Sequence, residues 1–88
     1  MDSGMAHAMG RFPEHATSIH DRFHADQRFR EMCGDYADAL RALQRWQASR
    51  GPYKAPRVEE YRELARALEV EIVTALRSPA PGKEHDPT

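Results

Sequence analysis

Two stretches of the chain repeat apolar residues at alternating spacings of three and four, and this pattern limits the fold more than any other feature. Residues three and four positions apart share one face of an α-helix, so the pattern predicts helices at about 27–48 and about 56–77. Each would be roughly 33 Å long. The two apolar faces consist of Phe29, Met32, Tyr36, Leu40 and Leu43 in the first helix, and of Tyr61, Leu68, Ile72 and Leu76, flanked by Leu64, in the second.

The segment between these two helices favours a reversal of the chain. Gly51 tolerates the left-handed backbone that often ends a helix, and Pro52 cannot continue one. Pro56 suits the first turn of the next helix. Two helices of similar length joined by a short link pack as antiparallel neighbours, so we expect an all-α fold built on a two-helix hairpin.

A shorter helix is expected ahead of the hairpin, at about 14–24. Pro13 fits an N-terminal helix position, and Ile19 and Phe23, four positions apart, share one face. Asp26 then interrupts the pattern. Its carboxylate is a good acceptor for the unpaired N–H groups at the start of the next helix.

The ends of the chain lack helical periodicity. We therefore expect one helical domain at 12–77 between a disordered N-terminus (1–11) and a disordered tail (78–88) that is rich in proline. Met5 and Met9 are alternative candidates to Met1 for the start of translation.

Composition narrows the class of protein. The 88 residues include 13 basic and 14 acidic side chains, a balance that argues against nucleic-acid binding through a strong positive field. No run reaches the roughly 18 apolar residues of a membrane span, and no secretory signal is recognisable. Cys33 is the single cysteine, so no internal disulfide framework is expected. These features favour a cytoplasmic protein.

A two-helix layer buries only one side of each apolar face, so we expect a second layer. The simplest source is a homodimer that forms a four-helix bundle, and the alternative is a different, unidentified protein. Trp46 lies about 80° from the centre of its helix's apolar face, at 100° per residue. It either covers the open end of the hairpin or joins the predicted interaction face.

Few residues suggest chemistry. His20 and His24, four apart on one helical face, form a candidate metal pair for zinc or copper, and the soft ligands Met1, Met5, His7 and Met9 form a further cluster that could hold copper. The Glu-x-x-His pair of di-iron bundles, a glycine-rich phosphate loop and a nucleophile elbow are missing. We therefore expect no cofactor and no enzyme. A non-enzymatic interaction or self-association module is the favoured hypothesis, with a metal-binding helical protein as the alternative.

The order of residues also resembles a known family. The Phe12-Pro13-Glu14-His15 opening and the Asp26-x-x-Phe29 step, followed by the apolar positions of both long helices, are similar to the YdcH-like family of short bacterial proteins. The resemblance covers about 12–77 and implies a helical hairpin without an established biochemical function. The proline-containing link and Trp46 depart from the family pattern.

Overall fold

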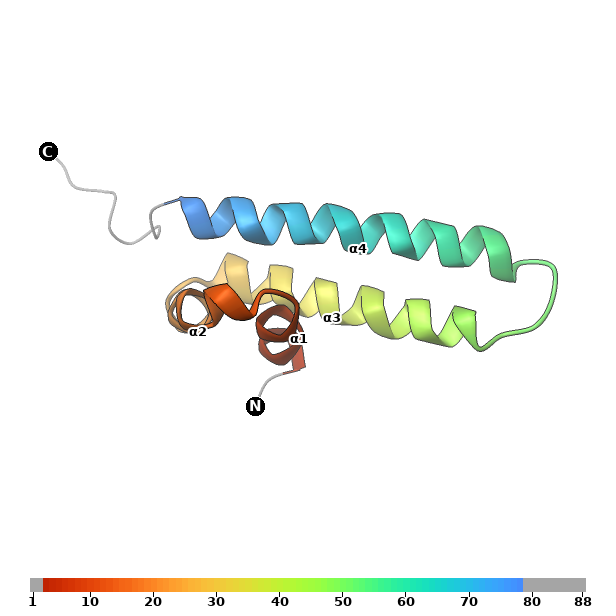
Figure 1. The fold of residues 1–88 in the computed structure, drawn as a ribbon, viewed down its shortest axis with the longest axis horizontal. Coiled ribbons are helices and arrows are strands. Elements are labelled where there is room, and N and C mark those ends of the chain that lie inside the picture. The colour runs from red at the N-terminus through yellow and green to blue at the C-terminus, as the bar shows by residue number, and fades with distance from the viewer. Residues whose placement is uncertain (1–2, 79–88) are drawn as a thin grey trace, which may run out of the picture.

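The computed structural model describes residues 3–78, and these are almost entirely helical. No strand occurs within this range, which confirms the all-α prediction. The elements are α1 (Ser3–Arg11), the 3-10 turn η1 (Pro13–His15), α2 (Ala16–Ala25), α3 (Gln27–Gln47) and α4 (Lys54–Arg77). The chain runs out along α3 and returns along α4, so the two long helices lie side by side in opposite directions (Figure 1).

The break between α2 and α3 follows from a side-chain cap. Asp26 has an extended backbone, and its Oδ1 accepts hydrogen bonds from the backbone N–H groups of Arg28 (3.0 Å) and Phe29 (3.3 Å). These N–H groups have no partner inside the helix, so the carboxylate stabilises the start of α3. The predicted cap is confirmed.

The link between α3 and α4 is shorter than predicted. Gly51 has φ 126°, the left-handed region that glycine occupies without strain. The final helix begins at Lys54 rather than at Pro56, which occupies the first turn of α4. Proline is tolerated there because the first four N–H groups of a helix have no intrahelical acceptor.

The N-terminal prediction was wrong for residues 3–11, which form α1 rather than a disordered segment. Met5, Ala8 and Phe12 fall on one face at spacings of three and four, and all three are buried. A nine-residue helix with so little apolar area is marginal alone and depends on packing, which periodicity does not reveal. The predicted disorder of residues 1–2 and 79–88 lies outside the described part of the chain.

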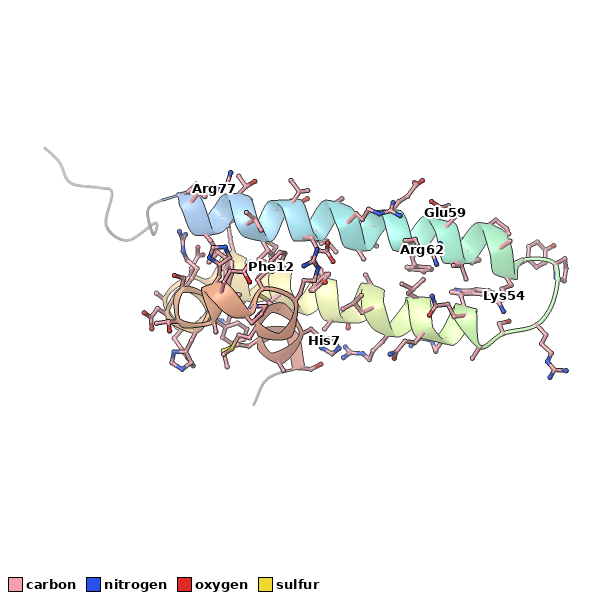
Figure 2. The ribbon with its side chains drawn as sticks, in the orientation of Figure 1. His7, Phe12, Lys54, Glu59, Arg62 and Arg77 are labelled. Atoms are coloured by element: carbon pink, nitrogen blue, oxygen red, sulfur yellow. The ribbon has the colours of Figure 1, made fainter. Side chains whose placement is uncertain are left out.

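The predicted short helix at 14–24 is present in altered form, as η1 followed by α2. Ile19 is fully buried and Phe23 is 7% exposed, so the face predicted for this helix packs inward. Both α1 and α2 are seen nearly end-on in Figure 1, where they cross α3 instead of running along it. Phe12, at the end of α1, lies between α1 and α4 (Figure 2).

The described part of the molecule has two unlike halves. We call residues 3–39 and 65–78 the base, where α1 and α2 add a layer to the hairpin, and residues 40–64 the arm, where α3 and α4 stand alone (Figure 1). The largest fully buried side chains all lie in the base: Tyr36, Phe29, Ile19, Ile72 and Cys33. Within the arm, only Ala42 is buried.

Candidate interaction surface

The structure divides the predicted interaction face according to these halves. Four of its side chains are buried inside the base and belong to the core of a single chain: Phe29, Tyr36, Leu68 and Ile72. Six are half-buried: Met32, Leu40, Leu43, Trp46, Tyr61 and Leu76. Leu64 is 45% exposed. The part of the face that remains accessible therefore lies mainly in the arm.

The extra layer of the base depends on a contact between two helix backbones. A methyl group added at Gly4 would lie 2.8 Å from the carbonyl carbon and oxygen of Cys33 and from the amide nitrogen of Gly34. Such distances are shorter than any van der Waals contact, so α1 approaches α3 this closely only because residue 4 is glycine. Gly34 itself has open space where its Cβ would be, so it is not required for the approach.

A polar network joins three helices of the base. The hydroxyl of Tyr36 on α3 donates to Glu69 Oε2 on α4 at 2.7 Å, and Arg11 Nε on α1 lies 3.2 Å from the same oxygen. Burial, followed by the hydrogen bond to Glu69 and the charge of its carboxylate, raises the pKa of Tyr36 above its ordinary value. The phenol therefore remains a neutral donor, and the network fixes α1 against the hairpin.

A second polar contact closes the end of the base. Arg22 Nη2 donates to the carbonyl of Ala75 at 2.6 Å and also to that of Ser78, at the C-terminus of α4. Its Nη1 donates to Asp26 Oδ2 at 3.4 Å. A cation is favourable at a helix C-terminus, where carbonyl groups lack intrahelical partners. One arginine thus connects the α2–α3 junction to the last turn of α4.

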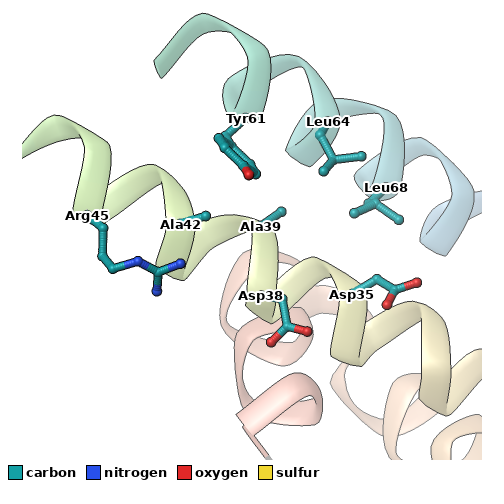
Figure 3. A pocket seen from close by; sticks show the side chains of 8 residues that line it. All are labelled: Asp35, Asp38, Ala39, Ala42, Arg45, Tyr61, Leu64 and Leu68. Atoms are coloured by element: carbon teal, nitrogen blue, oxygen red, sulfur yellow. The ribbon is translucent and has the colours of Figure 1, made fainter. Parts of the chain in front are cut away.

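The arm has no such cover, and a groove of about 430 Å³ lies between α3 and α4. It begins at the edge of the base and extends into the arm (Figure 3). Its apolar part comes from Ala39 and Ala42 on α3 and from Tyr61, Leu64 and Leu68 on α4. Its charged rim comes from Asp35, Asp38 and Arg45 on α3. The groove offers apolar area and charges of both signs, and its lining contains no nucleophile with an adjacent base.

Trp46 lies beside this groove but does not line it. The guanidinium of Arg57 on α4 is 5.9 Å from the centre of its indole ring. This distance fits a cation–π contact across the hairpin. Trp46 therefore contacts α4 of its own chain near the link.

The predicted metal pair lies on α2, away from the groove. The rings of His20 and His24 pack edge to face with their centres 4.6 Å apart, and His20 Nδ1 is 3.5 Å from Asp21 Oδ1. Among residues 3–78, no group of three or more His, Cys, Asp or Glu side chains is placed to hold a metal ion. A structural zinc site takes four ligands, so the described residues supply at most part of one.

Comparison of the chain with protein-family models, with curated proteins and with solved structures finds no match. The resemblance to the YdcH-like family therefore stays a prediction. None of the helices in residues 3–78 is long and apolar enough to cross a membrane.

Proposed function

We propose that the protein is a non-enzymatic interaction module that self-associates through the groove between α3 and α4, so that two hairpins form a four-helix bundle. The observation that carries the proposal is the missing layer of the arm. In the base, α1 and α2 cover the hairpin, whereas no helix in the described part of the chain covers Tyr61 and Leu64, the apolar groove residues of the arm that are half-buried or exposed.

Burial of the groove would supply a favourable free energy of association. Leu64 is 45% exposed, and Tyr61 is half-buried. Complete burial of a leucine side chain is worth about 1.5–3 kcal/mol relative to full exposure, so covering the exposed 45% of Leu64 would contribute about 0.7–1.4 kcal/mol. A two-fold interface uses the same patch on both copies, so each such contribution occurs twice.

Sedimentation of the full chain at micromolar concentrations tests this proposal. We expect a concentration-dependent dimer, and we expect Leu64→Gln to shift it toward monomer. Val70→Gln is the matched control, because Val70 is also an exposed apolar residue of α4 (65% exposed) but does not line the groove. A monomer that unfolds cooperatively and shows no association at these concentrations would overturn the proposal.

Metal binding by His20 and His24 is the second candidate, supported by the contact between their rings on one face of α2. The remaining ligands would come from solvent or from another chain. Added zinc or copper should then raise the melting temperature of the natural sequence but not that of His20→Ala. An unchanged melting temperature in the presence of both metals would exclude this candidate.

A further inference from the structure

We propose that two copies pair their grooves in antiparallel fashion about a two-fold axis, with Asp35 of each copy opposite Arg45 of the other. This inference rests on the self-association proposed above and specifies its partner and its register. It follows from the order of the residues on the groove side of α3, from their charges and from the shape of the groove.

The order of these residues is symmetric in a way that suits a two-fold axis. Asp35, Asp38, Ala42 and Arg45 all line the groove and follow one another at spacings of three, four and three, so they form one stripe along α3. The outer pair, Asp35 and Arg45, and the inner pair, Asp38 and Ala42, share a midpoint at position 40. An antiparallel copy centred there places Asp35 opposite Arg45 and Asp38 opposite Ala42.

The charges at the two ends of the stripe remain available for a partner. Asp38 already pairs with Arg41 of its own chain. Within residues 3–78, neither Asp35 nor Arg45 has a side-chain hydrogen bond or ion pair, and both are exposed. A parallel copy would bring like charges together at both ends, which is unfavourable. The antiparallel copy instead forms two opposite-charge pairs.

The middle of the groove permits the close approach that this pairing needs. Ala39 and Ala42 have small side chains that do not protrude from α3. Leu64, on α4, lies across the groove from Ala39 (Figure 3). The two alanines are themselves buried (2% and 6% exposed), so a leucine-sized side chain from each copy would enter the open part of the other's groove beside them. A peptide of uniform charge would be repelled at one end of the rim, since the rim is acidic at one end and basic at the other.

Charge reversal in the full-length chain tests the register. Asp35→Arg and Arg45→Asp should each weaken the dimer by about tenfold or more, because each places two like-charge pairs at the interface. The double variant, Asp35→Arg with Arg45→Asp, should restore the affinity of the natural sequence. Glu63→Arg is the matched control, since Glu63 is exposed on the arm and does not line the groove.

The outcomes of this sedimentation series separate the two proposals. A dimer that is weakened by the single reversals and restored by the double reversal supports the two-fold pairing. A dimer that the single reversals leave unchanged, or that the double reversal fails to restore, overturns this pairing but leaves self-association standing. If the natural sequence is monomeric throughout, both proposals fail. Circular dichroism of each variant verifies that the exposed substitutions leave the helices intact.

Discussion

The base and the arm contain segments of the same two helices, yet they reach different degrees of burial. In the base, α1 and α2 cover the hairpin and leave Phe29 and Ile72 without solvent exposure. In the arm, the same kind of apolar periodicity leaves Leu40, Leu43 and Tyr61 only half-buried. An apolar stripe therefore does not by itself identify an interface. The apolar face of a helix becomes part of the core where the same chain supplies another layer. Where the chain supplies no such layer, an interface with another molecule is expected.

The largest effect should come from removing the close approach that builds the base. Gly4→Ala places a methyl group 2.8 Å from the backbone of α3, so α1 must shift or detach. We expect the free energy of unfolding to fall by about 1–3 kcal/mol, the usual cost of overpacking. Urea denaturation measures this change. Reaction of the Cys33 thiol with a thiol reagent should accelerate, because Cys33 is fully buried and its backbone lies against α1.

Gly10→Ala is the control for this variant, since nothing lies within 4 Å of its added Cβ. It should leave stability unchanged or raise it by up to about 1 kcal/mol through higher helix propensity. Equal destabilisation by both substitutions would contradict the specific contact at Gly4. In the Gly4→Ala variant, the apolar face of the long helices in the base should become partly exposed, as it is in the arm.

A pair of tyrosines provides the next comparison. Tyr36→Phe removes the hydrogen bond to Glu69 in the base and should lower the free energy of unfolding by about 1–2 kcal/mol. Tyr61→Phe, in the groove, should change it little, since the Tyr61 hydroxyl has no hydrogen bond within residues 3–78. Urea denaturation at low protein concentration compares the two. Equal losses would contradict the unequal roles of base and arm.

The sequence predicts the parts of this fold that depend on local chemistry. The Asp26 cap and the apolar periodicity indicate where α2, α3 and α4 lie, because capping and helical spacing act between residues close in the chain. Periodicity does not identify α1, whose docking depends on the absence of a side chain at Gly4. Nor does it identify the groove, because Ala39 and Asp35 lie off the apolar stripe and gain their significance only from their position beside α4.

The smallest predicted effect concerns alkaline pH. Because the pKa of Tyr36 is raised in the folded chain, the unfolded chain loses this proton at a lower pH than the folded one. The contribution of Tyr36 is therefore fully present below about pH 10, the ordinary tyrosine value, and declines as the pH rises above it. The free energy of unfolding, measured in urea from pH 9 upward, should fall more steeply for the natural sequence than for Tyr36→Phe. Parallel slopes would contradict a role for this proton.

Hydrogen exchange at two protein concentrations tests whether the base is complete within one chain and the arm is completed by a second copy. We predict that amides in residues 35–64 become more protected as the concentration rises from well below to well above the dissociation constant, while those of α1 and of residues 27–34 of α3 do not change. Unchanged protection at both concentrations, or increased protection confined to the base, would show that a second copy does not complete the arm.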